Sequence, residues 1–273
     1  MHLAGYCLGG TMVAIAAAAL GGQDVVADAA RLPKIATLTL LAAQTDFTEA
    51  GELSIFISPA QLAMLEATMH KKGVLESKQM GGAFAMLRAQ DLIWQPIVNN
   101  YVKGKRDAMI DLMAWNADGT RMPWKMHTEY LMGLYLRNDL AEGRYVANGE
   151  QLSLSDVTAP MFVVGTETDH VAPWKSVYKV GALTSSPEFT FLLTSGGHNA
   201  GIVSGPVHPK RRHRVRTTRA GEPKLAADEW FETTAPLPGS WWPTWADWLK
   251  AHSSKERVAP PAMGAPDAGY API

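Results

Sequence analysis

The sequence predicts an α/β fold in which a helical insertion interrupts a parallel sheet. Short apolar runs alternate with helical patterns at both ends of the chain, in residues 2–43 and 157–193. Between them, residues 58–144 place apolar residues at helical spacing and show no clear strand alternation. Because strands that alternate with helices are typical of parallel sheets, we interpret the middle block as an insertion into one sheet.

The first elements surround a glycine-rich turn. Residues 2–4 are expected to end a strand, and residues 5–10 to form a tight turn. Residues 11–20 predict a helix, because they are mostly strong helix formers and two glycines follow them. Residues 35–43 are a short apolar run with Thr and Ile, which is typical of a buried strand.

The remaining elements follow in the same way. Helices are expected in the middle block at residues 59–70, 82–92 and 125–136. Residues 157–165 predict another buried strand, a polar turn follows at 166–170, and Pro173 opens a helix near residues 174–180. Residues 189–193 predict a further strand, which leads into a glycine-rich turn that ends at His198.

The end of the chain contains three segments of different composition. Residues 210–219 are strongly basic, and we favour a solvated loop for them. Residues 239–252 predict a helix with four tryptophans at roughly helical spacing, and we favour packing of these side chains on the sheet. The division we expect is a discontinuous α/β core at residues 1–50 and 151–252, a helical cap at 51–150, and a disordered, proline-rich tail at 253–273.

Composition and charge exclude several classes of protein. Of the 273 residues, 47% are hydrophobic and 19% are charged, which suits a packed globular protein. The formal net charge of −1 gives no indication of nucleic acid or of an anionic membrane surface as a partner. A single cysteine excludes an internal disulfide and suggests a reducing compartment. No spacing of His, Asp and Glu resembles a metal site, so no metal is expected.

An uncharged stretch at residues 3–22 resembles a signal peptide or membrane helix only superficially. No Lys or Arg precedes it, although a signal peptide needs a positive n-region. Several glycines interrupt it, and it is rich in Ala rather than Leu. We therefore expect a cytoplasmic protein with no transmembrane segment.

The turn Gly5-Tyr6-Cys7-Leu8-Gly9 fits the pattern G-x-C-x-G, a nucleophile elbow with Cys in place of Ser. In such a turn the nucleophile sits between strand and helix, and the glycines two residues before and after it avoid clashes. The helix N-terminus favours a thiolate, and the N–H of Leu8 is a candidate oxyanion donor. The alternative is that Cys7 is a buried structural cysteine.

Asp169 and His198 complete a possible catalytic triad. Each follows a predicted strand, so both are expected at the C-terminal edge of the sheet. The order Cys, Asp, His is the chain order of α/β-hydrolase triads. His198 would then be the general base for Cys7, and Asp169 would orient its imidazole. The alternatives are a loop or capping carboxylate for Asp169 and a surface loop histidine for His198.

These motifs together resemble polyhydroxyalkanoate synthases, and more closely their single-subunit class that prefers short-chain monomers. The matching stretches are GYCLGG at residues 5–10, DHVAPW at 169–174, GHNAG at 197–201, GELS at 51–54, WNAD at 115–118 and GSWWP at 239–243. The resemblance extends from about residue 1 to 252 and implies an α/β-hydrolase fold with a cap.

The resemblance also implies an activity, namely polymerisation of (R)-3-hydroxyacyl-CoA with release of coenzyme A. Cys7 would carry the acyl chain, and His198 would be the base. Asp169 would be the third member of the triad or would activate the 3-hydroxyl of the incoming unit. His170 would support the catalytic residues without contacting the substrate. No cofactor is implied, since the substrate itself carries coenzyme A. The implied partners are the growing polyester, the polymer granule surface and a second copy of the chain.

In one respect the sequence departs from the family. Core strands and a loop that supplies a second oxyanion N–H are expected before the elbow, which here lies close to residue 1. The chain is therefore expected to be the C-terminal part of a synthase, and whether it is active alone stays open. A thioesterase or depolymerase with the same triad, and a non-catalytic fragment that binds granules or another subunit, are the alternatives. For the basic residues 210–219, the alternative to a solvated loop is that they attract coenzyme A phosphates or an acidic partner. For the tryptophans of residues 239–252, the alternative to packing on the sheet is contact with the polymer granule or a second subunit.

Overall fold

The computed structural model describes residues 1–22, 34–105, 108–260, 263–269 and 271. A six-stranded sheet has the order β1–β2–β7–β8–β9–β10. Its strands are β1 (His2–Tyr6), β2 (Thr37–Leu41), β7 (Met161–Thr166), β8 (Glu188–Thr194), β9 (Arg212–Arg219) and β10 (Leu237–Pro238). The first four are parallel, as expected, whereas β9 is antiparallel to β8 and β10 to β9. The sheet is mixed because of the connection after β8. From the C-terminal end of β8 the chain returns directly into β9, instead of first crossing to the edge of the sheet where β8 begins.

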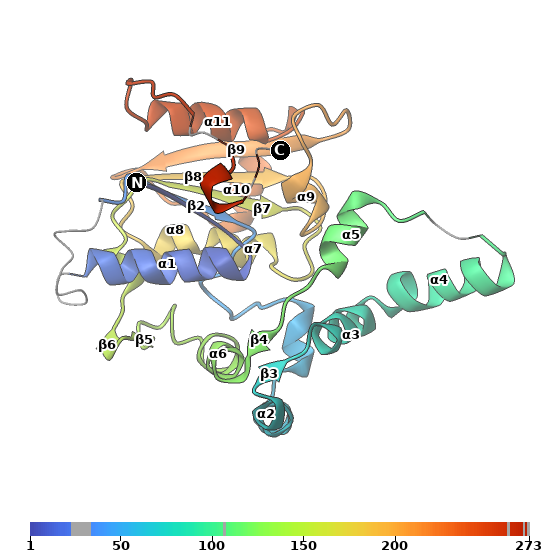
Figure 1. Cartoon of the computed structure of the whole chain (residues 1–273). Helices are drawn as coiled ribbons and strands as arrows, with labels where there is room; N and C mark the ends of the chain where they lie inside the picture. The colour runs from blue at the N-terminus through green and yellow to red at the C-terminus, as the bar shows by residue number, and fades with distance from the viewer. Residues whose placement is uncertain (23–33, 106–107, 261–262, 270, 272–273) are drawn as a thin grey trace.

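Helices cover both faces of the sheet (Figure 1). On one face lie α1 (Leu8–Gly21), α7 (Trp174–Tyr178), α8 (Val180–Leu183) and α10 (Ala227–Thr233), and on the other lie α9 (Ala200–Val203) and α11 (Trp242–Ala251). Each face of the sheet has its own apolar core: the first lies under α1 and the second under α11. Along β7, Met161 and Val163 belong to the first core, and Phe162 and Val164 belong to the second. Since neighbouring strand residues point to opposite faces, a strand covered on both sides is apolar throughout.

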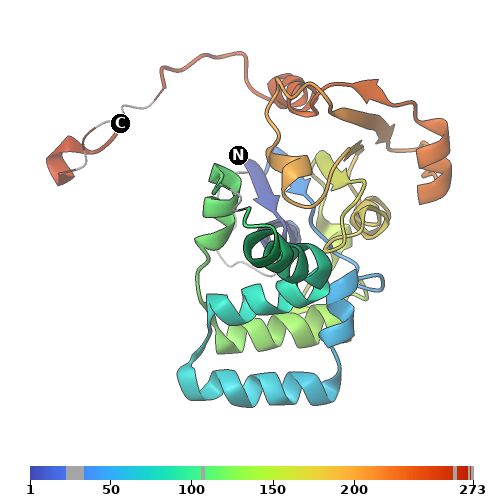
Figure 2. The same ribbon diagram turned by 90° about the vertical axis from the view of Figure 1, so that its right-hand side faces the viewer.

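The segment between β2 and β7 carries the remaining α-helices of the described residues, and a 3-10 turn lies near the end of the chain at Pro266–Ala268. The segment contains a 3-10 turn at Glu52–Phe56, α2 (Pro59–Lys72), α3 (Ser77–Leu87), α4 (Gln95–Ile97), α5 (Asp111–Ala117) and α6 (Trp124–Tyr130), with π-helical turns at Gln90–Trp94, Val98–Val102 and Leu131–Leu136. Helix α2 begins where Ser58 caps the N–H of Gln61, and it ends at Gly73 with a φ of 75°. Figures 1 and 2 show α2, α3 and α6 gathered below the sheet, with α4 extending away from it.

Two-residue strand pairs in this region escaped the sequence pattern, because they are too short to alternate. They are β3 (Val74–Leu75) with β4 (Met122–Pro123), and β5 (Val146–Ala147) with β6 (Glu150–Gln151). The division into core and cap stays a prediction. Residues 23–33 of the expected core, and residues 261, 262, 270, 272 and 273 of the expected disordered tail, lie outside the described residues.

Several predicted boundaries are wrong. Strand β1 runs to Tyr6 instead of ending at residue 4. Helix α1 begins at Leu8 rather than at residue 11, because the turn is confined to Cys7 and both following glycines are helical. Strand β7 begins at Met161 rather than at residue 157, since a 3-10 turn at Leu154–Asp156 and Pro160 precede it. The helix expected at 82–92 is α3, which begins at Ser77 and ends at Leu87.

The basic segment is not a solvated loop, since most of it is strand β9, which pairs with β8 over seven residue positions from Glu188 to Thr194. The expected packing of the tryptophans is confirmed. Trp241 is 1% exposed, and with Trp242, Trp245 and Trp248 it contacts the second core.

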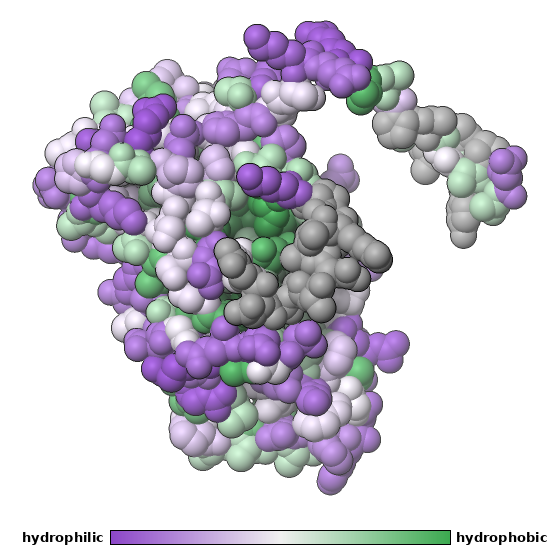
Figure 3. Space-filling view, turned by 90° about the vertical axis from the view of Figure 1, so that its left-hand side faces the viewer, coloured by the Kyte–Doolittle hydropathy of each residue, from purple (hydrophilic) through white to green (hydrophobic). Residues whose placement is uncertain are grey.

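Polar residues form much of the outer surface. Figure 3 shows hydrophilic residues over most of one face, with hydrophobic residues gathered in a hollow near its centre. Within the described ranges, the helices are all too short or too polar to cross a lipid bilayer.

Candidate active site

Cys7 occupies the sharp turn between β1 and α1. Its φ is 53°, a region that non-glycine residues seldom adopt. Its N–H donates to the carbonyl of Leu41 on β2 at 2.8 Å, and its carbonyl accepts from the N–H of Gly10 at 2.9 Å. The turn is therefore anchored to the neighbouring strand on one side and starts the helix on the other. This strand–turn–helix arrangement is the one that the elbow pattern predicts.

Two of the three glycines at the elbow are required by close packing. A Cβ on Gly5 would lie 2.5 Å from the carbonyl oxygen of Gly9, and one on Gly10 would lie 2.4 Å from the Cβ of Ala43. At Gly9 no described atom would lie within 4 Å of a Cβ. The expected clash is therefore confirmed at Gly5 and wrong at Gly9, because α1 turns that position away from β1. Gly10 instead lets α1 approach both β1 and the segment after β2.

Asp169 lies in the turn after β7 with its side chain buried. One carboxylate oxygen, Oδ1, accepts the backbone N–H groups of Val171 at 2.9 Å and Ala172 at 2.8 Å. The other, Oδ2, accepts the hydroxyl of Thr166 at 2.8 Å and lies 2.9 Å from Nδ1 of His198. Burial by itself raises the pKa of Asp169, but these hydrogen bonds and the charge of His198 lower it below its ordinary value. The carboxylate is therefore held in its charged form.

His198 links this carboxylate to Cys7, because its imidazole is hydrogen-bonded to both residues. Since Nδ1 faces Asp169, Nε2 is the ring nitrogen that remains for the thiol. Burial by itself lowers the pKa of His198, but the hydrogen bonds to Asp169 and Cys7 and the charges of both groups raise it to about 10. The structure thus brings together all three residues that the sequence placed in a triad.

Leu8 and His170 lie beside these three residues. Leu8 is the first residue of α1, where backbone N–H groups have no intrahelical acceptor, and its role as an oxyanion donor stays a prediction. His170 follows Asp169, and its carbonyl accepts the N–H of Glu52 at 3.0 Å. This contact fixes the backbone of the Asp169 turn, and the supporting role of the His170 side chain stays a prediction.

Three tyrosines at the site were not predicted. The ring of Tyr6 lies 5.3 Å from that of His198, and its hydroxyl donates to the His198 carbonyl at 3.3 Å and to the side-chain oxygen of Asn199. Tyr130 and Tyr135 come from the middle block, and their hydroxyls are hydrogen-bonded to each other.

Burial and the nearby charge of Cys7 raise the pKa of each of these tyrosines, to about 12 for Tyr135. They therefore remain neutral hydroxyl donors at ordinary pH. Tyr6 lies inside the elbow motif and was within reach of sequence reasoning. Tyr130 and Tyr135 carried no signal beyond aromatic residues in a helical pattern.

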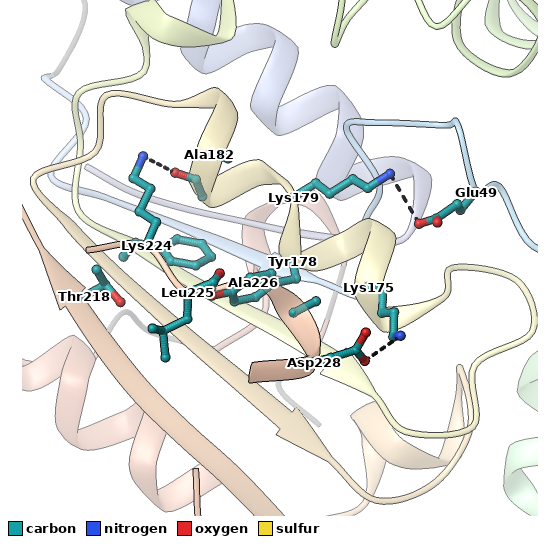
Figure 4. A pocket seen from close by; sticks show the side chains of 13 residues that line it. Glu49, Lys175, Tyr178, Lys179, Ala182, Thr218, Lys224, Leu225, Ala226 and Asp228 are labelled. Carbon is teal, nitrogen blue, oxygen red and sulfur yellow. Dashed lines mark hydrogen bonds and ion pairs between the residues drawn. The ribbon is translucent and has the colours of Figure 1, made fainter. Parts of the chain in front are cut away.

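A separate cavity of about 380 Å³ lies between α7–α8 and residues 224–228 (Figure 4). Its ammonium groups already have partners. Lys175 pairs with Asp228 at 2.6 Å, Lys179 with Glu49 at 3.3 Å, and Lys224 donates to a carbonyl of α8. The triad residues do not line this cavity. In the part of the chain that the structure describes, no three His, Cys, Asp or Glu side chains are grouped to hold a metal.

Comparisons with known proteins identify the fold family and the relatives of the chain. A family model for the alpha/beta hydrolase fold matches residues 1–204. The chain is 40% identical to the poly(3-hydroxyalkanoate) polymerase subunit PhaC of Rhizobium etli, over 95% of this chain and 39% of that protein. It is 40% identical to a poly(3-hydroxyalkanoate) polymerase of Methylorubrum extorquens, over 93% of this chain and 40% of that protein. The corresponding subunit of Cupriavidus necator is 31% identical over 97% of this chain and 44% of that protein.

The chain spans about two fifths of the length of these curated relatives. Among solved structures, a monoacylglycerol lipase of Paleococcus ferrophilus matches with a TM-score of 0.45 at 14% identity, over 92% of this chain and 68% of that chain. A likeness at that level supports no conclusion about activity.

Proposed function

Since the chain belongs to the alpha/beta hydrolase fold family and is similar to poly(3-hydroxyalkanoate) polymerases over most of its length, we propose that it is an acyltransferase that polymerises (R)-3-hydroxyacyl-CoA. The observation that carries the proposal is the hydrogen-bonded series Cys7, His198, Asp169 at the end of three strands of one sheet. A thiol nucleophile suits this reaction, because attack on a coenzyme A thioester exchanges one thioester for another at little cost.

In the first step the Cys7 sulfur attacks the thioester carbonyl, and His198 holds the proton of the thiol. The carbon–sulfur bond to coenzyme A breaks, and the coenzyme A thiolate takes that proton as it leaves. The Leu8 N–H donates to the oxyanion that forms in between. In the second step His198 removes the proton of the 3-hydroxyl of another unit, whose oxygen attacks the acyl–Cys7 carbonyl. An ester bond forms, and the Cys7 thiolate is released and recovers the proton from His198.

The contacts of Asp169 favour His198 as the base for the 3-hydroxyl. Each oxygen of a carboxylate has two lone pairs. Oδ1 already accepts two backbone N–H groups, and Oδ2 accepts Thr166 and faces His198. Direct activation of a substrate hydroxyl by Asp169 would require one of these bonds to break. Asp169 is therefore proposed to hold the imidazole and to stabilise its charged form.

The surroundings of Cys7 favour transfer to a hydroxyl over hydrolysis. Phe47 lies with its ring 4.7 Å from that of Tyr135 and 6.3 Å from that of Tyr130. Both tyrosines lie near enough to Cys7 to respond to its charge. An aromatic lining of this kind excludes water from an acyl intermediate. The proposal includes no cofactor, since coenzyme A arrives with the substrate. It also includes a cytoplasmic location at the granule surface and association of two copies of the chain.

The proposal is tested with the purified chain and (R)-3-hydroxybutyryl-CoA. Free coenzyme A is measured by chromatography, and the acyl group on Cys7 by mass spectrometry of the peptide. Polymer, coenzyme A and an acylated Cys7 are expected, and Cys7→Ala should abolish all three. Free 3-hydroxybutyrate in place of polymer would identify a hydrolase. Turnover that survives in Cys7→Ala would overturn the assignment of the nucleophile. A chain that is never acylated but sediments with polymer granules would be a non-catalytic binding protein.

A further inference from the structure

The segment that follows His198 is tied down by the C-terminal part of the chain. The indole N–H of Trp241 donates to the carbonyl of Gly201 at 3.1 Å, and that of Trp242 donates to the carbonyl of Ile202 at 2.9 Å. The hydroxyl of Ser240 donates to the carbonyl of Ser204 at 3.3 Å. Three consecutive residues of the chain, Ser240 to Trp242, therefore bind the backbone of the short helix α9 and the residue after it.

Arg211 binds the same segment from the side of β9. Its guanidinium donates from Nη1 to the carbonyl of Ser195 at 2.9 Å and from Nη2 to the carbonyl of Ala200 at 2.8 Å. Nε and Nη2 also donate to the hydroxyl of Ser204, at 2.9 and 2.6 Å. The acceptors at Ser195 and Ala200 stand on either side of His198. The planar guanidinium of Arg211 therefore fixes the distance between Ser195 and Ala200, the two ends of the turn that carries His198.

The same segment is packed against the support of the carboxylate. A Cβ on Gly201 would lie 2.7 Å from Cγ2 of Thr166, whose hydroxyl donates to Asp169. A Cβ on Gly196, whose φ is 108°, would lie 2.4 Å from Nη1 of Arg211. Both glycines thus allow a close approach that a side chain would prevent. A shift of α9 would move the His198 turn against Thr166 and Asp169.

We propose that Arg211 and the indole N–H groups of Trp241 and Trp242 are positioning residues, which together form a clamp that sets the place of His198 between Asp169 and Cys7. The proposal rests on His198 as the base of the proposed function. It gives the basic segment and the tryptophan motif a role that sequence patterns did not suggest. Buried carbonyls need partners, and here the partners come from two distant segments that meet only in the folded chain.

The test compares Trp241→Phe, Trp242→Phe and Arg211→Lys with a matched control, Trp245→Phe. Trp245 lies on α11 with Trp242, but its indole N–H donates to the hydroxyl of Thr39 on β2 at 3.1 Å instead of to α9. The rate of Cys7 alkylation by iodoacetamide is measured from pH 5 to 10, together with kcat, KM and Tm. His198→Gln defines the profile without an imidazole partner.

In each clamp variant the rate of Cys7 alkylation at pH 6 is expected to fall by about 3- to 10-fold, which corresponds to the loss of one hydrogen bond. The pH profile of the rate should move toward that of His198→Gln. The value of kcat should fall by a similar factor and KM should stay within about twofold of the parent's, a split that general loosening of the fold would not give. Trp245→Phe should keep the parent's profile even if its Tm falls.

Two results would overturn the clamp: clamp variants whose profiles coincide with the parent's, or a control that shifts as far as they do. Alkylation needs no substrate, so the clamp can be judged even if the chain releases no coenzyme A. In that case the proposed function is wrong, and the pH profiles of Cys7 alkylation alone decide whether the clamp exists.

Discussion

Nδ1 of His198 lies 2.9 Å from Oδ2 of Asp169, although the residues are 29 positions apart in the chain. The two strands that precede them, β7 and β8, are parallel neighbours in which Thr166 pairs with Thr194. Because parallel neighbours end at the same edge, the turns that come after them meet there. The contact is thus a consequence of strand register. It lowers the pKa of Asp169 and raises the pKa of His198.

Asp169→Asn should cut the rate of coenzyme A release by about 10,000-fold, the loss seen when a triad aspartate becomes an amide. The amide cannot supply the charge that raises the pKa of His198, and its NH₂ group must face either the imidazole or two backbone N–H groups. Initial rates with (R)-3-hydroxybutyryl-CoA measure the effect. Asp247→Asn is the control, since Asp247 is exposed and pairs with the exposed Lys250 at the surface. A loss of less than tenfold in Asp169→Asn would contradict the proposed role.

Stability should depend on pH through His198. Its folded pKa of about 10 exceeds the ordinary value of about 6.5, so its protonation stabilises the fold fully below about pH 6.5. This contribution is lost as the pH rises through the folded pKa. The free energy of unfolding in urea, measured at pH 6, 8 and 10, should therefore differ between the parent and His198→Gln most at pH 6 and least at pH 10. A difference that is constant across these three values would show that His198 is not held protonated.

The elbow and the acid–histidine pair were predictable, because both depend on local motifs at strand ends. Strand β9 was not, since its arginines suggest a solvated loop until their partners are known. Arg212 pairs with Glu167 at 2.6 Å, and the guanidinium of Arg214 lies 4.2 Å from the ring centroid of Phe231. Such partners are far apart in the sequence. An alternation of charged and apolar residues cannot identify them.

The tyrosines near Cys7 were missed for a related reason. Tyr130 and Tyr135 are five residues apart, a spacing that a straight α-helix does not place on one face. The helix changes to π-helical geometry at Leu131–Leu136, which brings the two hydroxyls together. Such a change has no sequence pattern of its own. It depends on packing of the middle block over the elbow.

Trypsin should cut the middle block before the sheet. The described residues of α3, α4 and the π-helical turns beside α4 include none that is buried, and Met86, Trp94 and Tyr101 are exposed. Segments with little buried area open at low cost. Mass spectrometry of early fragments should find cleavage after Arg88, Lys103 or Lys105, while β9, also rich in arginine, stays intact. Early cleavage within β9 would mean that the sheet opens first.

The elbow glycines should differ sharply when each is replaced by Ala. Gly5→Ala and Gly10→Ala should destabilise the fold by about 1–3 kcal/mol or more, since each new Cβ meets backbone or a buried methyl group at 2.4–2.5 Å. Gly9→Ala should be neutral or stabilise by up to about 1 kcal/mol, because its Cβ meets no described atom within 4 Å and Ala favours the helix. Urea unfolding of the three variants measures the effect. Equal losses at Gly5 and Gly9 would mean that α1 begins later than Leu8 and that the turn extends through Gly9, as the glycine pattern alone suggests.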